Sequence, residues 1–342
     1  MRRRLQTLGT ILAAWLCVAD TLHAQQRERD LERLGERIGR SVEQAIEQAV
    51  RALENAFSTL DRTWGKEGQS GEKVDTVFAF AADGVVDLTA LSGDIVVTGW
   101  TRREARVRAW TEAGRLRWRF TPSRITLETE RVRGRSGDTK YDLTVPEGAR
   151  LIVRTMSGDV SVRTVKGGVD VSSLSGTVRL LDGGGSVDVE SMSGDVSVVR
   201  CRCDVRAGAV SGKIGIEDVE GSIRAETTSG EIEIADVRSE DLLASTVSGD
   251  VSYRGPLSPR GRYEFRAHSG SIELFVPPNS SGRFDIRTYS GSFDTELAVT
   301  LEAGQSARSR PRAMTFTLGG GDAVVIAETF SGNVVLGRDR RR

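Results

Sequence analysis

The segment that decides the fold reads SGDVSVRTVKGGVDVSSL (157–174), SGTVRLLDGGGSVDVESM (175–192), SGDVSVVRCRCDVRAGAV (193–210) and SGKIGIEDVEGSIRAETT (211–228). These four units are equally long, and each opens with Ser-Gly. The pair recurs on both sides at wider spacing. A repeat of fixed period is typical of solenoid folds. We expect its glycine to form the tight, left-handed corner of each unit. These glycines are Gly93, Gly158, Gly176, Gly194, Gly212, Gly230, Gly249, Gly270, Gly291 and Gly332.

Apolar and polar residues alternate after every Ser-Gly. In the units from Ser157 to Ser290, position four is apolar, position six is apolar in all but the unit that begins at Ser290, and position five is polar or glycine. The position-four residues are Val160, Val178, Val196, Ile214, Ile232, Val251, Ile272 and Phe293. Such alternation places one side of a strand inside and the other outside. A second short strand follows in each unit, as in Val169-Asp170-Val171.

Two short strands cannot bury an inner face alone, but stacking each unit on the next in parallel does so. The sequence therefore predicts a mainly β fold, a right-handed parallel β-helix with coils of about 18 residues. The expected solenoid covers residues 74–337, with regular coils over 157–291. An antiparallel sandwich of hairpins is the alternative, but it would not need identical columns at a fixed period.

The N-terminus has the pattern of a secretory signal peptide. Arg2, Arg3 and Arg4 precede an apolar stretch, and small residues allow cleavage after Ala24 or after Ala19. We expect residues 1–24 to be removed. The apolar run of about twelve residues is shorter than the roughly 20 that a membrane span needs. No later stretch is apolar enough to cross a bilayer, so we expect an exported protein of the periplasm, the outer surface or the extracellular space.

Residues 27–62 carry an apolar stripe at helical spacing. Its members are Leu31, Leu34, Ile38, Val42, Ile46, Val50, Leu53, Phe57 and Leu60, which average about 3.6 residues per step. This spacing predicts one long amphipathic helix before a linker at 63–73. The helix could lie along the solenoid or cap its end; self-association and a membrane-surface role are the alternatives.

Charge is balanced overall, with 48 basic and 48 acidic residues. Removal of 1–24 takes three Arg and one Asp, which leaves 45 basic and 47 acidic residues. A net charge near −2 gives no basis for nucleic-acid binding. The tail 338–342 is basic and could touch anionic lipid or polysaccharide, although a solvated tail is the simpler expectation.

Two cysteines, Cys201 and Cys203, remain after export. Partners two residues apart are awkward to bridge, so we expect one buried thiol and one turn thiol rather than a disulfide. A metal site would need further ligands, and His268 is the only histidine of the mature chain. No metal and no cofactor are expected.

Two segments, LTVPEGARLIVRTMSG (143–158) and LFVPPNSSGRFDIRTYSG (274–291), share a strand ending at Val-Pro, a turn and a strand entering Ser-Gly. Together with the repeated SGDVxV units, this pattern resembles the bacterial putative-adhesin family, an exported β-strand-repeat domain of unknown function related to autotransporter adhesin head domains. The resemblance covers about residues 75–337. It implies a β-helical, extracytoplasmic, non-enzymatic protein and supplies no functional residues.

Four groups of residues could carry chemistry. Position three stacks Asp159, Thr177, Asp195, Lys213, Glu231 and Asp250, which suits either an acidic cleft or a solvated charge ladder in which Lys213 pairs with Asp195 and Glu231. His268 precedes Ser269, and residues 182–188 contain a glycine-aspartate run like that of calcium repeats. A basic-aromatic stretch could bind acidic glycans, or place its arginines outward and its tryptophans inward. It comprises Trp100, Arg102, Arg103, Arg106, Arg108, Trp110, Arg115, Arg117, Trp118 and Arg119.

We expect the charge ladder and not a cleft, because bare units of this short length leave no room for loops that would enclose a catalytic pair. The sequence therefore predicts no catalytic residue and a non-catalytic, adhesin-like scaffold or binding module of the cell envelope. Its partner would be an envelope glycan, a protein or another copy. The alternatives are a β-helical glycan-active enzyme and an envelope-stress accessory protein.

Overall fold

The computed structural model describes residues 69–112, 114–130, 138–297, 300–301 and 313–339. The expected signal peptide, the expected helix at 27–62, most of the expected linker and the end of the basic tail lie outside these residues. The described part is all β, and none of it is a helix that could span a membrane.

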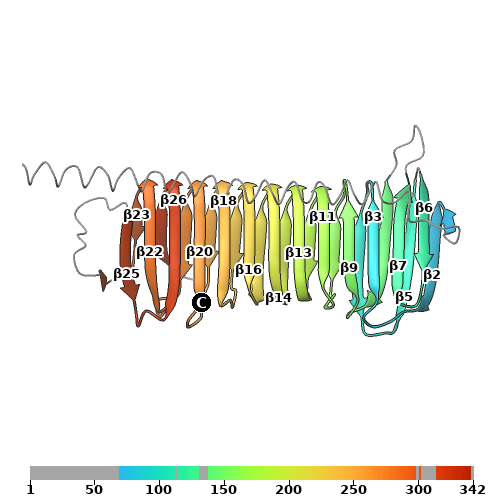
Figure 1. The fold of residues 1–342 in the computed structure, drawn as a ribbon, viewed down its shortest axis with the longest axis horizontal. Helices are drawn as coiled ribbons and strands as arrows, with labels where there is room; N and C mark the ends of the chain where they lie inside the picture. Colours follow the sequence, from blue (N-terminus) through green and yellow to red (C-terminus); the bar gives the residue numbers. More distant parts are fainter. Residues whose placement is uncertain (1–68, 113, 131–137, 298–299, 302–312, 340–342) are drawn as a thin grey trace, which may run out of the picture. The chain divides into compact units, whose positions relative to one another are not determined.

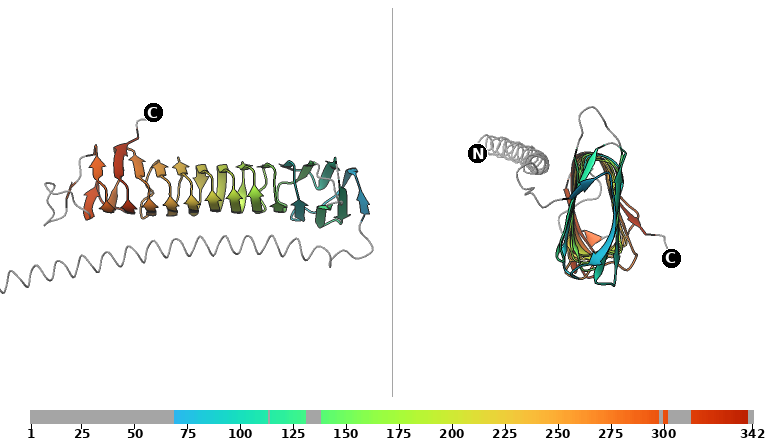
Figure 2. Two further views of the ribbon diagram at one scale, coloured as in Figure 1. Left: turned by 90° about the horizontal axis from the view of Figure 1, so that it is seen from above. Right: turned by 90° about the vertical axis from the view of Figure 1, so that its right-hand side faces the viewer.

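The strands form a nearly closed solenoid with a flattened cross-section (Figure 2). Two sheets face each other, and they link into one 27-stranded sheet because β14 (Val196–Ser211) runs through both. The first sheet holds the strands that follow Ser-Gly, and the second holds the strands that lead into it.

In spatial order, the first sheet is β2 (Lys73–Ala79), β5 (Glu104–Thr111), β8 (Thr139–Pro146), β4 (Ile95–Trp100), β10 (Val160–Arg163), β12 (Val178–Leu181), the start of β14, β15 (Ile214–Glu220), β17 (Ile232–Ala235), β19 (Val251–Arg254), β21 (Ile272–Val276), β27 (Val334–Arg338) and β23 (Phe293–Thr295).

The second sheet is β1 (Gln69–Gly71), β6 (Arg115–Phe120), β7 (Arg124–Glu130), β3 (Val85–Ala90), β9 (Arg150–Thr155), β11 (Val169–Ser175), β13 (Gly184–Ser193), the end of β14, β16 (Ile223–Ser229), β18 (Asp241–Ser248), β20 (Arg262–Ser269), β26 (Ala323–Ser331), β22 (Gly282–Ser290), β25 (Ala313–Leu318) and β24 (Thr300–Leu301).

The apolar columns of the repeat line the interior. Val160 pairs in parallel with Val178, Val178 with Val196 and Val196 with Ile214. These residues and the position-six residues beside them are buried, while the residues between them face out. Toward the C-terminus the interior widens to hold aromatic rings, which include Tyr253, Tyr263, Phe265 and Phe284.

Coils do not stack in chain order at the C-terminal end. Repeat spacing predicts that the unit beginning at Ser290 stacks on the unit beginning at Ser269. Instead β26 lies between β20 and β22, so that Ser331 pairs with both Ser269 and Ser290 (Figure 1). The chain therefore leaves one position open after β20 and fills it later, with β26. The expectation that coils stack in chain order is wrong at this end of the solenoid. Which strands become neighbours depends on which side-chain columns match, and not on the order of the strands along the chain.

The N-terminal end has the same arrangement in reverse. Strand β3 pairs with β7 on one side and with β9 on the other, and β4 lies likewise between β8 and β10. The antiparallel strands β5 and β6 connect these coils and pair with β2 and β1. At the other end, β24 and β25 run antiparallel beside β22. Antiparallel strands thus form both ends of the second sheet, whereas the first sheet ends in the short parallel strand β23.

Crowding between coils explains the Ser-Gly corners. A Cβ on Gly194 would lie 2.1 Å from the carbonyl oxygen of Gly176 on the neighbouring coil. At each of the ten corner glycines, an added Cβ would lie within 2.3 Å of a carbonyl oxygen of an adjacent coil. Seven of them also have positive φ, whereas Gly230, Gly291 and Gly332 do not. Close approach of backbones is thus the shared requirement, and the left-handed conformation is secondary.

The second corner contains left-handed residues that are not glycine. Thr164, Asp182, Arg200, Asp218 and Asp236 all have φ between 53° and 58°. They recur once in each of five successive coils: Thr164, Asp182 and Asp236 directly follow β10, β12 and β17, whereas Arg200 and Asp218 lie within β14 and β15. Three of these five residues are aspartate, which accepts the left-handed conformation more readily than most residues, but the sequence analysis did not predict this column.

Cys201 and Cys203 form a disulfide, which corrects the expectation of two free thiols. Both side chains point into the solenoid from β14, and both are buried. Their Cα atoms are 5.4 Å apart, within the range that disulfides ordinarily span. The expectation treated two thiols on the same side of a strand as too strained to bridge, whereas their Cα atoms lie close enough for a disulfide.

Candidate functional site

The position-three residues lie at the Ser-Gly corner, where three of the aspartates bind backbone. Asp159 Oδ1 accepts a hydrogen bond from the Thr177 amide at 2.8 Å, and Asp195 Oδ1 accepts one from the Lys213 amide at 2.9 Å. Asp250 Oδ1 does the same for Ser271 at 2.7 Å. Each aspartate thus joins its coil to the next one, a structural role that the sequence analysis did not assign.

Lys213 pairs with acidic residues of the following coil. Its Nζ lies 2.5 Å from Glu233 Oε1 and 3.6 Å from Glu231 Oε2. These contacts, the hydrogen bond with Glu233 first, raise the pKa of the Lys213 ammonium. The predicted pairing with Asp195 is wrong, because that carboxylate already accepts the Lys213 backbone amide. The ladder therefore consists of paired charges at the edge of a shallow hollow of about 320 Å³.

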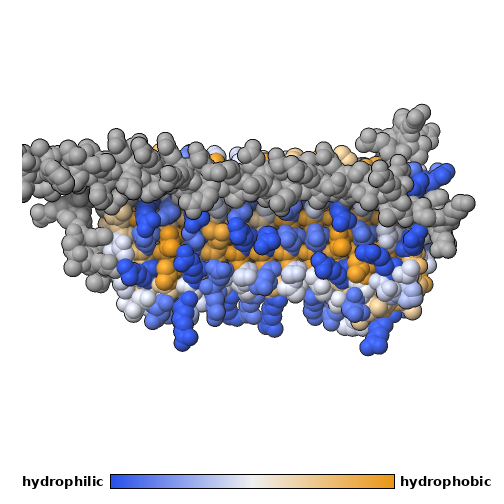
Figure 3. All heavy atoms as spheres, viewed as in Figure 1, coloured by the Kyte–Doolittle hydropathy of each residue, from blue (hydrophilic) through white to orange (hydrophobic). Residues whose placement is uncertain are grey.

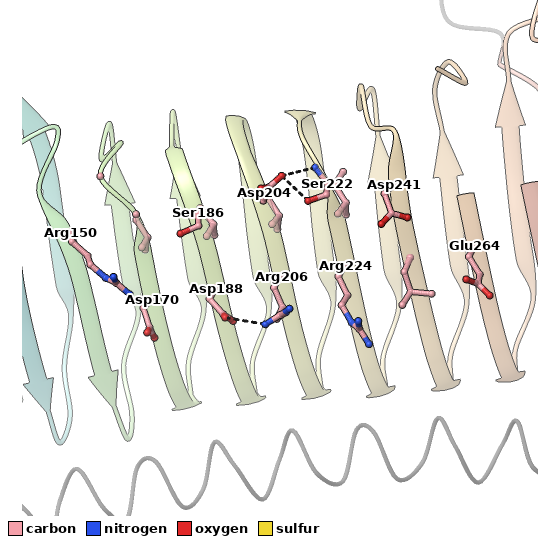
Figure 4. A pocket seen from close by; sticks show the side chains of 17 residues that line it. Arg150, Asp170, Ser186, Asp188, Asp204, Arg206, Ser222, Arg224, Asp241 and Glu264 are labelled. Carbon is pink, nitrogen blue, oxygen red and sulfur yellow. Dashed lines mark hydrogen bonds and ion pairs between the residues drawn. The ribbon is translucent and has the colours of Figure 1, made fainter. Parts of the chain in front are cut away.

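A larger groove of about 600 Å³ runs across the outer face of the second sheet. It crosses seven neighbouring strands, from β9 to β20, whose outward side chains lie in two rows, one at the level of Asp204 and one at the level of Arg206 (Figure 4). Charged residues of both signs line it: Arg150, Asp170, Asp188, Asp204, Arg206, Arg224, Asp241 and Glu264. The space-filling view shows hydrophilic and hydrophobic residues interspersed on this face (Figure 3). The groove is an open surface and not an enclosed pocket.

Two carboxyl groups of this face have raised pKa values. Burial is the main cause at Asp188, which Arg206 opposes at an Nη1–Oδ2 distance of 3.8 Å and Asp170 reinforces. Burial is again the main cause at Glu190, with Asp188 and Asp170 adding negative charge nearby. One oxygen of Asp188 is buried without a hydrogen bond. An oxygen in this state favours a ligand that brings a hydrogen-bond donor.

Asp204 shows how the groove's upper edge is held. Its Oδ1 accepts hydrogen bonds from the Ser222 amide at 2.9 Å and from the Ser222 hydroxyl at 2.7 Å. These bonds lower the pKa of the Asp204 carboxyl. Strands β14 and β16 are thereby tied together by side chains as well as by backbone.

Structural surroundings of His268 and Ser269 give no catalytic arrangement. The His268 ring stacks on Phe330 with centroids 5.0 Å apart, and Ser269 pairs with Ser331. Asp182 binds Arg200 at the second corner, whereas Asp188 lies on the sheet face beside Arg206. Among the described residues no three His, Cys, Asp or Glu side chains gather as a metal site would require.

Residues of the basic-aromatic stretch lie on β4, in the turn that follows it, on β5 and on β6. On β5, Arg106, Arg108 and Trp110 point outward, while Ala105, Val107 and Ala109 point inward. Trp110 is 40% exposed, so the expectation that the tryptophans pack inward is wrong for this residue. Trp118 on β6 packs against the core, and Trp100 donates a 2.7 Å hydrogen bond to the Glu104 carbonyl. Trp110 shares its alternating register on β5 with Arg106 and Arg108, so the period-two pattern of this strand was the signal that could have placed it outward.

This fold defines a β-solenoid of two-stranded coils with polar outer faces. Residues 81–224 and residues 204–336 each match the family model described as Toastrack DUF4097. The two matches together span residues 81–336. The chain belongs to this family, and the resemblance to the putative-adhesin family inferred from the sequence is confirmed.

Two solved structures are similar to the chain. One is a putative cell adhesion protein from Clostridium sporogenes, at 8% identity and a TM-score of 0.19, covering 78% of this chain and 100% of its own. The other is a putative adhesin from Bacteroides fragilis, at 12% identity and a TM-score of 0.32, covering 80% and 98%. No curated protein matches the sequence.

Proposed function

We propose that the protein is a non-catalytic, exported module of the cell envelope whose second-sheet face binds an extended polar polymer. The observation that carries this proposal is the groove of about 600 Å³, which repeats charged side chains along seven strands. A surface with the same elements at each strand suits a ligand that also repeats, such as an envelope glycan or an extended protein strand. Self-association through the same face is the other form of the proposal.

The domain plan follows the sequence. Residues 1–24 are a cleaved signal peptide, 27–62 a helix, 63–73 a linker, 74–337 the solenoid and 338–342 a basic tail. The coils are right-handed and of about 18 residues; the parallel pairing of β10, β12 and β14 supports this, because crossovers between parallel strands favour that hand. The ten corner glycines are its structural signature. No transmembrane span is left after cleavage, and nucleic acid is not a partner.

Export is tested directly by the start of the mature chain. Mass spectrometry of the purified envelope fraction should find Gln25 as the first residue, or less often Asp20. An intact Met1 in the cytosol would contradict export, and the envelope role with it.

The proposal that the protein is not an enzyme rests on the short connections at the coil corners, which leave no loop to enclose a catalytic pair. From β10 to β22 the longest connection between consecutive strands is the seven residues between Arg254 and Arg262. Asp195 and Glu231 belong to the corner bonds and to the Lys213 pair. The protein should release no new reducing ends from envelope polysaccharides. Polymer cleavage that is lost in Asp195→Asn with Glu231→Gln would support the glycan-active enzyme instead.

Binding is tested with a charge reversal on each sheet. Arg206 lies in the groove and Arg179 on the opposite sheet, with exposed side-chain fractions of 66% and 61%. Arg206→Glu should weaken retention of the protein on isolated cell-wall sacculi and on an acidic polysaccharide column. Arg179→Glu should leave it unchanged. Equal effects of the two variants would show that retention follows net charge and not the groove.

The outer face of β5 is a second candidate surface. Trp110 is 40% exposed, and Val77 on the neighbouring β2 is 53% exposed. Arg106 and Arg108 stand between them on the same face. An exposed indole among arginines suits an acidic sugar, which would stack on the ring and pair with a guanidinium. Trp110→Ala should then weaken acidic-polysaccharide binding more than Arg206→Glu does.

A further inference from the structure

The first sheet ends on its N-terminal side in β2, a strand of seven residues with the sequence KVDTVFA. In the described part of the chain β2 pairs on one side only, with β5. The right view of Figure 2 looks onto this end of the solenoid. The other outermost strands are much shorter: β1 and β23 have three residues each, and β24 has two. Strand β2 is therefore the long open edge of the described structure.

Every second residue of β2 directs its backbone away from β5. The Phe80 amide donates to the Arg103 carbonyl at 3.1 Å, and the Thr111 amide donates to the Glu72 carbonyl at the same distance. Bonded and non-bonded pairs alternate along an antiparallel ladder, so the even-numbered residues of β2 are the ones that bond to β5. The amides and carbonyls that face the open edge belong to Lys73, Asp75, Val77 and Ala79.

The interior of the solenoid is incompletely covered at this end. On β5, the inward residues Ala105, Val107 and Ala109 are at most 1% exposed, because strands flank them on both sides. On β2, the inward Phe78 is only half-buried. Its ring stacks on that of Phe120 from β6, which is half-buried as well, with centroids 5.1 Å apart. The last layer of the core thus ends in aromatic rings that a further layer of strands would cover.

Strand β2 has little of the protection that sheet edges usually carry. It contains no proline, no bulge and no inward charge. Its one lysine, Lys73, stands at the first position and is balanced by Asp75, while Val77 is 53% exposed. Proline, bulges, inward charges and several lysines are the usual devices that keep an edge from pairing. A neutral segment of this length that readily forms a strand is suited to pair with another strand.

A second β2 fits this edge better than the other outermost strands do. Two copies of β2 that run antiparallel about a two-fold axis at Thr76 overlap over all seven residues. On the inner face this register sets Val74 opposite Phe78 of the second copy. At the edge it lets Asp75 and Val77 of the two copies exchange backbone hydrogen bonds. Strand β1 or β23 of another copy would match only three residues. Closed two-fold dimers are also the commonest assemblies of identical chains.

We propose that the N-terminal end of the solenoid is a dimer interface, in which β2 pairs antiparallel with β2 of a second copy about Thr76. The first sheet then continues from one molecule into the other, and the Phe78 and Phe120 rings of the two ends lie against each other. This contact uses neither the charged groove nor the outer face of β5, so it does not depend on what those surfaces bind.

A proline on the open edge provides the first test. The chain from Gln25 onward should sediment as a dimer at micromolar concentration. Val77→Pro removes an amide that β5 does not use, so the solenoid should melt near the parent temperature. The dimer dissociation constant should rise about tenfold or more, because each copy loses a hydrogen bond of the interface. Thr295→Pro is the matched control on β23, where the Glu296 amide and not that of Thr295 bonds to β27, and it should leave the dimer intact.

Three results of this test would overturn the proposal. The first is a monomeric parent, or a dimer that Val77→Pro does not weaken. The second is equal weakening by the two prolines, because β23 takes no part in the proposed contact. The third is assembly beyond two chains, which would show head-to-tail stacking of unlike ends.

Disulfide cross-linking tests the register and does not rely on the proline variant. Across a non-hydrogen-bonded antiparallel pair the Cα atoms are about 4.5 Å apart, within the range of disulfides. Thr76→Cys should therefore form a covalent dimer under mild oxidation. Lys73→Cys should not, although this position is more exposed, because the two copies of residue 73 lie about 20 Å apart in this register. Equal cross-linking of both variants, or none in Thr76→Cys, would contradict the pairing about Thr76.

Discussion

Arg200 forms a two-point ion pair with Asp182, which occupies the same place one coil earlier. Its Nε lies 2.8 Å from Oδ1 and its Nη2 3.2 Å from Oδ2. Both residues have positive φ, at 53° and 54°. The hydrogen bonds lower the pKa of the Asp182 carboxyl. A corner that is unfavourable for L-residues is thus accompanied by an exposed side-chain contact between successive coils.

Thr164 stands in the same corner column, and its branched Cβ makes positive φ costly. Thr164→Gly should raise the free energy of unfolding by about 1 kcal/mol, because glycine accepts a φ of 58° freely. Ser161→Gly, on the outer face of β10, is the matched control and should lower it by about 0.5–1 kcal/mol. Urea denaturation of both variants measures the difference. A loss in both would mean that the corner is not strained.

Gly194→Ala should destabilise the protein by about 3 kcal/mol or more, because the new methyl group would meet the Gly176 carbonyl at 2.1 Å and φ is 146°. Gly215 lies on the outer face of β15, where the nearest atom to a new Cβ is 3.9 Å away. Gly215→Ala should therefore be neutral or slightly stabilising. Thermal melting followed by circular dichroism separates the two. Similar melting temperatures would contradict the close approach of the coils.

Removing a whole coil should be tolerated. Deletion of 193–210 joins Met192 to Ser211 and lets Val178 pair with Ile214, so the buried columns stay aligned. We expect a folded protein that loses a few kcal/mol at most, since each coil contacts only its neighbours. Deletion of 193–201 removes half a coil and brings second-sheet residues into first-sheet columns, so it should misfold. Equal damage in thermal melts would mean that the repeat period is not a structural unit.

The pH dependence of stability should differ in sign between two acidic sites. At Asp188 and Glu190 the pKa is raised in the folded state, so the folded protein binds protons more readily than the unfolded chain. The parent should therefore gain stability relative to Asp188→Asn with Glu190→Gln as pH falls from 7 toward 4.5.

Asp182 is the control for that experiment, because its pKa is lowered in the folded state. Its contribution is present above the ordinary carboxyl pKa and is lost as pH falls through the folded-state value. The parent should lose stability relative to Asp182→Asn in acid. Urea titrations at several pH values give both differences, and the same sign at the two sites would refute the assignment.

The Cys201–Cys203 disulfide should contribute modestly. It closes a loop of three residues, for which the chain-entropy contribution is below about 2 kcal/mol. Reduction should lower the melting temperature by a few degrees and leave the β spectrum intact. Alkylation of the unfolded, unreduced protein should label neither cysteine; labelling of both would show that the bond is absent in solution.

The sequence determined the solenoid. The constant repeat period of its central units settled which residues point inward there, because period-two alternation and parallel stacking leave one arrangement that buries every valine column. The same pattern predicted the corner glycines and the family resemblance. It also indicated that residues such as Asp195 belong to a charge ladder.

Only the tertiary structure decided what lies between coils that are distant in sequence. The placement of β26 between β20 and β22 and the Asp159 bond to the next coil depend on which backbones become neighbours. A repeat specifies which side chains match, but several coils match equally well, so the order of stacking follows from how the ends close. The stacked rings of His268, Phe330 and Tyr289 arise in this way, from three residues that no local pattern in the sequence connects.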